Sequence, residues 1–132
     1  MILYMDREEM HSILDLIKKN ETGREMCGFF FTYGSNIKDV MFAKNKSEEP
    51  NSFKLGRFDI LKMKAFKLLY TFTMAIPFHT HRNGCELSAR DTLDLPQGLN
   101  CIISGDQYSF FNLRRNRNIV YRDEIPCQLV DS

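Results

Sequence analysis

The chain has 132 residues, of which 43% are hydrophobic and 27% charged. This composition excludes a disordered chain, and no apolar run reaches the roughly 20 residues needed to cross a bilayer. Lysine and arginine number 18 against 17 for aspartate and glutamate, which leaves a net charge of +1. A charge so close to zero argues against nucleic acid and against an anionic membrane as partners, because both select a basic excess.

The length predicts a single domain spanning residues 1–132, large enough to bury one core without disulfide staples. The N-terminal segment lacks the basic start and the long apolar run of a signal peptide. The four cysteines are widely spaced and form no Cys-x-x-Cys pair, so they do not indicate a secreted disulfide-rich protein. We therefore expect a cytoplasmic protein with reduced, mostly buried thiols.

The first third of the chain predicts a helix and a hairpin. Asp6 stands before apolar residues with the spacing of one helix face: Met10, Ile13, Leu14 and Ile17. We expect a helix over residues 7–20 with Asp6 as its cap. Residues 26–33 are rich in aromatic side chains and, with residues 37–43, flank a Gly-Ser-Asn turn, so the two segments predict paired strands.

The middle of the chain predicts a loop, two helices and a strand. Residues 44–53 are polar and loop-like, and residues 57–69 carry apolar side chains at helical spacing: Phe58, Leu61, Ala65 and Leu68. Residues 70–81 favour a strand, and Pro77 within them indicates an edge position or a strand start. Residues 88–95 predict a short helix that Pro96 and Gly98 would stop.

Three short strands are predicted in the last third of the chain, over residues 101–104, 108–113 and 119–122, with a turn between the last two. Helices and strands are mixed without regular alternation along the chain. This order favours an α+β fold, an α/β/α sandwich with a largely antiparallel sheet.

A His-x-His pair carries the clearest sign of chemistry. His79 and His81 are two residues apart, so on a strand both imidazoles point to the same face. Asp91 follows ten residues later, after a turn that can return the chain over the strand end. Two imidazoles and one carboxylate suit zinc, and three protein ligands leave one position for water.

Each of these residues also has a purely structural interpretation. A His-x-His pair alone is weak evidence, and Ser88-x-x-Asp91 is the pattern of a capping box that only starts a helix. Glu25 immediately precedes an apolar strand, so it is a candidate to lean over a cleft and transfer protons. Glutamates at strand starts are, however, often simply solvated.

Taken together, these residues resemble the JAMM (MPN+) metalloprotease family, also called JAB domains. The family pattern is a glutamate, then His-x-His far downstream, then Ser-x-x-Asp, here Glu25, His79-Thr80-His81 and Ser88-Ala89-Arg90-Asp91. The segments Glu25-Met26-Cys27-Gly28 and Gly84-Cys85-Glu86-Leu87-Ser88 are also similar to family segments. The resemblance implies an MPN/JAB-like fold, related to that of cytidine deaminases, with a mostly antiparallel curved sheet flanked by helices.

The resemblance also implies roles for single residues. His79, His81 and Asp91 would bind one zinc ion per chain. Glu25 would be the general acid and base, and Ser88 would stabilise the oxyanion of the tetrahedral intermediate. Thr80 would point to the opposite face and have a structural role.

Two departures from the family pattern concern the loop between the ligands. Arg82 stands where the family usually has proline. The spacer between His81 and Ser88 has six residues, one fewer than is common. Ser88 and Asp91 are both present in spite of the shorter loop, so we expect the site to survive with an altered substrate groove beside it.

The implied activity is cleavage after the C-terminal tail of a ubiquitin or ubiquitin-like protein, by a small stand-alone enzyme of bacterial or archaeal type. The expected partners are a ubiquitin-like protein or its conjugates and E1-like and E2-like proteins of the same system. Alternatives are a non-catalytic MPN-type interaction module, a metallopeptidase acting on a sulfur-carrier tail, and a relative of cell-wall amidases.

Other candidate residues receive structural interpretations. Cys27 and Cys85 flank the predicted site, which leaves a cysteine nucleophile or thiolate ligand as a minor alternative. His11 lies on the first predicted helix, away from the cluster. The basic residues 114–117 are expected to form an exposed, solvated turn.

Overall fold

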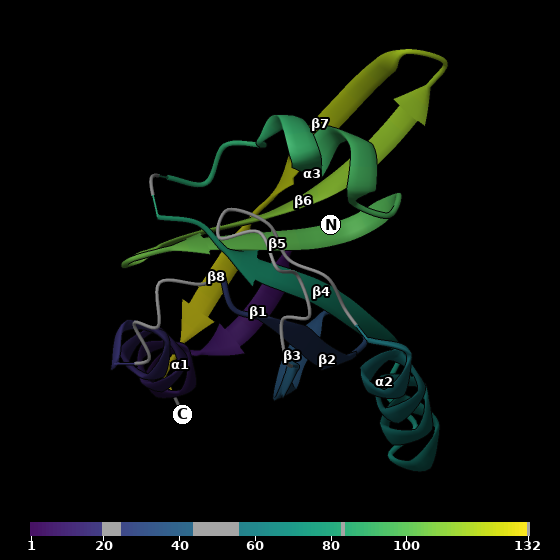
Figure 1. Ribbon diagram of the computed structural model, residues 1–132. Coiled ribbons are helices and arrows are strands. Elements are labelled where there is room, and N and C mark those ends of the chain that lie inside the picture. Colours follow the sequence, from purple (N-terminus) through teal and green to yellow (C-terminus); the bar gives the residue numbers. More distant parts are fainter. Residues whose placement is uncertain (20–24, 44–55, 83, 132) are drawn as a thin grey trace.

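The computed structural model describes residues 1–19, 25–43, 56–82 and 84–131 (Figure 1). Within them the helices are α1 (Arg7–Lys19), α2 (Arg57–Leu69) and α3 (Ala89–Asp94). The strands are β1 (Leu3–Asp6), β2 (Cys27–Tyr33), β3 (Asn36–Ala43), β4 (Met74–Thr80), β5 (Gly98–Ser104), β6 (Gln107–Asn116), β7 (Ile119–Ile125) and β8 (Cys127–Val130). None of the helices in these ranges is long and apolar enough to cross a membrane.

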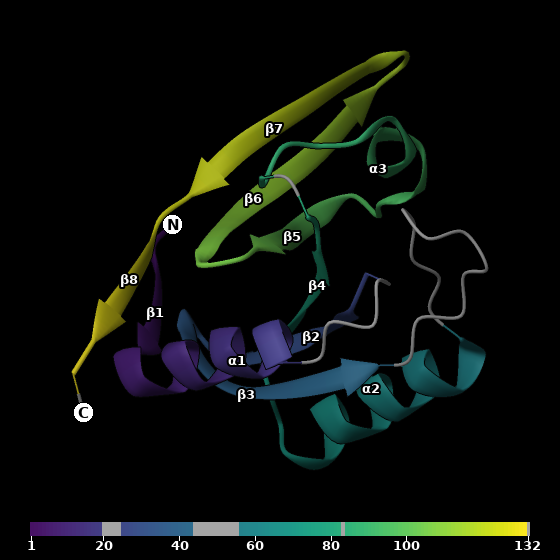
Figure 2. The same cartoon turned by 60° about the vertical axis from the view of Figure 1, so that its left-hand side comes forward.

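All the strands belong to one sheet with the order β7-β6-β5-β4-β2-β3-β1-β8. Pairing is antiparallel between β2 and its neighbours β3 and β4, and between β6 and its neighbours β5 and β7. It is parallel between β4 and β5 and on both sides of β1. The edge strands β7 and β8 follow each other in the chain through Pro126, so the sheet curls enough for its two edge strands to lie end to end (Figure 2).

Helices cover both faces of this curled sheet. Strand residues alternate between the two faces, so Phe30 belongs to the core under α1, whereas Phe29 and Phe31 belong to the opposite face. On that opposite face, α2 packs against β2 and β4 through Met63 and Phe66. A third cluster, on β5 and β6, packs beneath the segment that holds α3; it contains Leu95, Ile102, Phe111 and Leu113. The expected α+β sandwich is confirmed.

Most predicted elements are present with small shifts at their ends. The Asp6 carboxylate accepts a hydrogen bond from the Glu9 N–H at 3.1 Å, as expected of a helix cap. The second helix covers the predicted residues, and the three C-terminal strands are longer than expected. Strands β1 and β8 were missed, because each has only four residues and pairs with a distant part of the chain. The predicted loop over 44–53 lies outside the described residues.

The edge position expected from Pro77 is wrong. Strand β4 is internal, between β2 and β5. Pairing with β5 begins at Phe78, however, while Pro77 pairs only with Phe29 of β2. Pro77 has no N–H to donate, and it stands where β4 is not yet paired with β5, so no hydrogen bond between these two strands is lost.

The apolar pattern of α2 correctly predicts a helix, but these side chains do not face the sheet. Phe58, Leu61 and Leu68 are 75%, 67% and 81% exposed. The residues that anchor α2 are Met63 and Phe66, on the other side of the helix. Periodicity alone could not distinguish the two faces, because both are apolar.

Gly28 allows β2, β3 and β4 to approach closely. A Cβ atom at this position would lie 2.2 Å from the Met41 carbonyl oxygen and 2.6 Å from the ring of Phe78. We expect Gly28→Ala to lower the free energy of unfolding by about 3 kcal/mol, because backbone cannot move aside as a flexible side chain can. Gly34→Ala is the control, since nothing lies near its added Cβ and its left-handed backbone costs only ~1 kcal/mol. Urea unfolding measures both, and equal losses would contradict the steric explanation.

Candidate metal centre

The two histidines lie at the carboxyl end of β4. His79 is inside the strand and His81 follows it directly. The structure brings their imidazoles together, as the two-residue spacing predicted: their Nε2 atoms are 2.9 Å apart and their ring centroids 4.7 Å apart. Thr80 between them has the structural role expected of it, because its hydroxyl accepts a hydrogen bond from the Met26 N–H at 2.8 Å.

Asp91 reaches the histidines from the first turn of α3. Ser88 caps this helix: its hydroxyl accepts from the Asp91 N–H at 3.1 Å, and the Ser88 N–H donates to Asp91 Oδ2 at 3.0 Å. These reciprocal bonds are the predicted capping box. They also fix the orientation of the Asp91 carboxylate, so the capping role of this motif leaves Asp91 facing the histidines.

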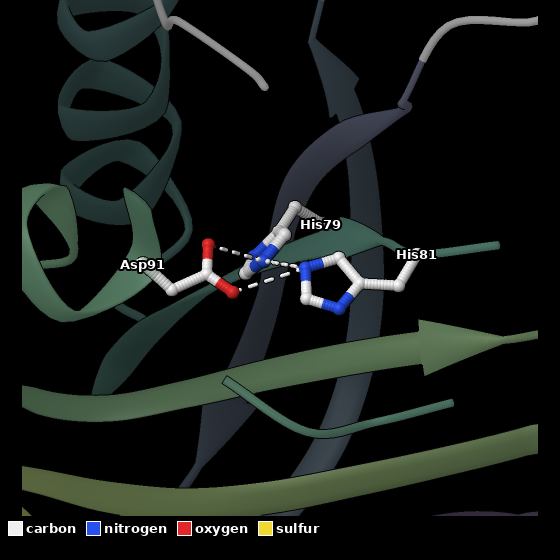
Figure 3. Close-up of side chains that lie close together, drawn as sticks. All are labelled: His79, His81 and Asp91. Carbon is white, nitrogen blue, oxygen red and sulfur yellow. Dashed lines mark hydrogen bonds and ion pairs between the residues drawn. The ribbon is translucent and has the colours of Figure 1, made fainter. Parts of the chain in front are cut away.

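The carboxylate and the two imidazoles converge on one point (Figure 3). Asp91 Oδ1 lies 3.1 Å from His79 Nε2, and Asp91 Oδ2 lies 3.0 Å from His81 Nε2. The His79 and Asp91 side chains are only 1% and 4% exposed, whereas the His81 side chain is 11% exposed. Solvent and ligands therefore reach the cluster mainly from the side of His81.

Burial and hydrogen bonding set the charges of the three groups. Burial lowers the pKa of His79 although the neighbouring Asp91 acts in the opposite direction, so this imidazole is neutral at pH 7. The hydrogen bond to Asp91 raises the pKa of His81. Burial by itself would raise the pKa of Asp91, but hydrogen bonds from both histidines more than offset it and hold the pKa well below its usual range. The centre thus combines an ionised carboxylate with one imidazole already neutral and a second that must lose any proton before it can bind a cation.

This arrangement fits a divalent metal ion. The ligand atoms of His79, His81 and Asp91 all lie within 4.8 Å of one another. Atoms that share a tetrahedral zinc ion at bond lengths of ~2.1 Å lie roughly 3.4 Å apart, close to the separations found here. Imidazole nitrogen and carboxylate oxygen are ligands that zinc accepts, and three of them leave a coordination position open.

Glu25 lies beside this cluster but is not one of its three converging groups. The backbone of the neighbouring Met26 holds it there through two hydrogen bonds with Thr80. The Met26 N–H donates to the Thr80 hydroxyl, and the Met26 carbonyl accepts from the Thr80 N–H at 2.9 Å. Burial raises the pKa of Glu25, with the charge of His81 opposing and that of Asp91 adding to the increase. A carboxylate with a raised pKa next to a metal centre is suited to accept and return a proton.

The cysteines near the centre are not suited to act as nucleophiles. Burial is the main cause that raises the pKa of Cys27 to about 12, and its thiol lies 3.7 Å from the Ala43 carbonyl oxygen. Burial also raises the pKa of Cys85. Both thiols are therefore protonated near pH 7, and a thiol is a much weaker nucleophile and metal ligand than a thiolate. All four cysteines are free, and Cys27 and Cys101 are fully buried.

The short loop between the ligands does not displace them. Ser88 and Asp91 keep their mutual hydrogen bonds, and Asp91 still reaches both histidines. Arg82 is exposed at the start of this loop. The three side chains therefore converge in spite of the shorter spacer, and the altered substrate groove beside them stays a prediction.

Sequence reasoning missed two arginines that hold this region. Arg115 was expected in a solvated turn, but it is half-buried and donates to the Thr92 carbonyl of α3. Arg122 donates to the Cys85 carbonyl in the loop before α3, at 2.7 Å. A weak signal existed: Arg115 continues the alternation of Phe111 and Leu113, whose side chains face the core beneath α3.

Comparison with known proteins supports the fold. The sequence matches no family model and no curated protein. Among solved structures, a protein from Desulfitobacterium hafniense superimposes with a TM-score of 0.74 at 18% identity, covering 98% of this chain and 95% of that one.

Two further solved structures connect the fold with a named domain. A JAB1/MPN domain protein from Archaeoglobus fulgidus has a TM-score of 0.56 at 10% identity, covering 96% of this chain and 98% of that one. A structure described as a JAMM, metalloprotease-like zinc site in the proteasome and signalosome has a TM-score of 0.53 at 11% identity, covering 97% and 99%. At identities this low, the similarity shows only a shared fold. The chain has the α+β fold of JAB1/MPN domain proteins.

Proposed function

We propose that this protein is a zinc-dependent peptidase that cleaves after the C-terminal tail of a ubiquitin or ubiquitin-like protein. The observation that carries the proposal is the convergence of His79, His81 and Asp91 at the carboxyl end of β4, with Glu25 beside them. Support also comes from the shared fold with a structure described as a metalloprotease-like zinc site.

His79, His81 and Asp91 would hold the metal ion in this proposal. A bound zinc ion polarises a carbonyl group and lowers the pKa of a water molecule towards ~7. The chain's own contribution is to present the neutral imidazole of His79, the imidazole of His81, which binds the metal once it has lost any proton, and a carboxylate that the Ser88 N–H keeps in one orientation.

Glu25 would move the proton during hydrolysis. Its carboxylate would accept a proton from the attacking water and then return it to the leaving amine. The pKa raised by burial supports both steps, because a group that is too acidic would not hold the proton in between.

Ser88 would stabilise the oxyanion that forms on the substrate carbonyl. Its hydroxyl oxygen already accepts the Asp91 N–H, and a hydroxyl that accepts a bond still has its own O–H to donate. A donor fixed in this way needs little reorganisation when charge develops on the substrate.

The substrate proposal rests on the motif that the chain shares with the JAMM family. An extended tail beside a strand edge would gain main-chain hydrogen bonds by β-addition. Ubiquitin-like proteins and their conjugates are the proposed substrates, and E1-like and E2-like proteins of the same system are proposed partners. Nucleic acid and membranes are not, since the net charge is close to zero.

The proposal is tested by zinc analysis together with cleavage of ubiquitin-like proteins that carry a C-terminal peptide extension. We use two fusions, one built on ubiquitin and one on a bacterial sulfur-carrier protein. We expect about one zinc per chain and cleavage directly after the tail, with both lost in His81→Ala. Zinc binding without cleavage of either fusion would contradict the peptidase and favour an interaction module.

A further inference from the structure

The short helix α3 needs contacts with other parts of the chain to be stable and to stay in position. It has six residues, and an isolated helix of this length is unstable in water because too few hydrogen bonds compensate the cost of nucleation. Its first turn nevertheless supplies Asp91, a group that must be held in position if it is to share a cation with the histidines of β4. Contacts from elsewhere in the chain must therefore fix α3 over the sheet.

Those contacts come from the hairpin of β6 and β7, which lies next to α3 (Figure 1). Arg115 of β6 donates from Nε and Nη2 to the Thr92 carbonyl oxygen, at 3.1 and 3.0 Å. Its Nη2 also lies 3.5 Å from the carbonyl oxygen of Asp91. The backbone N–H of Arg115 donates to the side-chain oxygen of Gln97 at 2.9 Å, and Gln97 lies three residues after the end of α3.

The chemistry of this contact suits its position. The last carbonyl groups of a helix have no partners within the helix, and a cation near them is favoured by the helix dipole. A guanidinium group directs several N–H donors from one rigid plane. Arg115 thus fixes the C-terminal half of α3, while the Ser88 capping box fixes the N-terminal half.

A second arginine secures the loop that leads into α3. Arg122 of β7 donates to the Cys85 carbonyl at 2.7 Å and to the Ser109 hydroxyl at 2.8 Å. Its guanidinium lies 4.2 Å from the ring centre of Phe111. Both attachments start from the same hairpin, so the hairpin holds the whole segment that carries Asp91.

We propose that Arg115 is the positioning residue that holds the Asp91 ligand over β4. The proposal rests on the proposed metal site and adds a residue that touches neither metal nor substrate. It predicts that loss of the guanidinium loosens α3 and weakens metal binding without altering any ligand. Residues that orient a metal ligand typically contribute 10–100-fold to affinity.

The test compares Arg115→Ala and Arg115→Lys with Arg114→Ala. Arg114 is the neighbouring arginine, and it pairs with Asp123 and Tyr121 on the exposed side of the hairpin. Zinc affinity is measured by competition with a chromophoric chelator. We expect an approximately 10–100-fold loss in Arg115→Ala, a smaller loss in Arg115→Lys, less than a threefold change in Arg114→Ala, and partial rescue of Arg115→Ala by added guanidinium ion. Wild-type affinity in Arg115→Ala would overturn the proposal.

Hydrogen exchange in the metal-free protein separates this proposal from the proposed function. We expect the Leu95 amide, which donates to the Asp91 carbonyl at the end of α3, to exchange faster in Arg115→Ala, while amides of β2 keep their protection. Unchanged exchange at Leu95 would overturn the positioning role whether or not the protein binds zinc. If Leu95 exchanged faster in Arg115→Ala but the wild-type protein bound no zinc, Arg115 would still be the residue that anchors α3. The metal site would be refuted instead.

Discussion

Replacing Glu25 by glutamine is expected to lower the rate of tail cleavage by about 10²-fold or more, the usual contribution of a positioned general base. Glutamine has the same shape but cannot take up the proton of the attacking water. Zinc content should remain near that of the wild type, because Glu25 is not one of the three converging ligand groups. Single-turnover cleavage of an extended ubiquitin-like fusion, with zinc measured in the same samples, checks this result.

Glu86→Gln is the matched control for Glu25→Gln. Glu86 lies in the loop between His81 and Ser88 and is exposed, so its replacement makes the same chemical change without altering the proposed proton carrier. We expect its cleavage rate to stay within about threefold of the wild type, since exposed side chains away from the chemistry contribute little. Equal losses in the two variants would show that negative charge near the site matters, and not proton transfer by Glu25.

The sequence predicted the ligand cluster because its parts are locally encoded. The two-residue spacing of His79 and His81 requires only that the segment be a strand. The Ser88-x-x-Asp91 pattern requires only that a helix begin there. Each motif therefore fixes its own geometry, and the parallel connection from β4 through α3 to β5 brings the two motifs together.

Features that depend on distant parts of the chain could not be predicted in the same way. Strands β1 and β8 are four residues long, and each needs a partner more than a hundred residues away. The sequence could not show which side of α2 packs against the sheet, because the helix carries apolar residues on both sides. Arg115 belongs to a sequence of charged residues that favours a solvated turn, and only the closeness of β6 to α3 reveals its contact with Thr92.

Replacing Asp91 by asparagine is expected to remove most of the zinc affinity while leaving the fold in place. The carboxamide oxygen can still accept the Ser88 N–H, so the cap of α3 is retained. The group has lost its charge and one of its two acceptor oxygens, however, and the wild-type carboxylate uses both, one toward each histidine. We expect the dissociation constant for zinc to rise by at least about 10²-fold, because weakening a ligand itself should cost more than losing a residue that only orients a ligand, which typically costs about 10–100-fold.

Thermal unfolding measures this loss independently of any substrate. A ligand at a hundred times its dissociation constant stabilises the folded state by about 2.7 kcal/mol, which corresponds to roughly 10 °C in Tm for a domain of this size. Wild-type protein should show this increase when zinc is added, and Asp91→Asn should show almost none. Asp94→Asn removes the same charge from an exposed position of the same helix, so it should respond like the wild type. If Asp94→Asn also lost the increase in Tm on addition of zinc, the effect of zinc would depend on the net charge of α3. Asp91 would then not be a ligand.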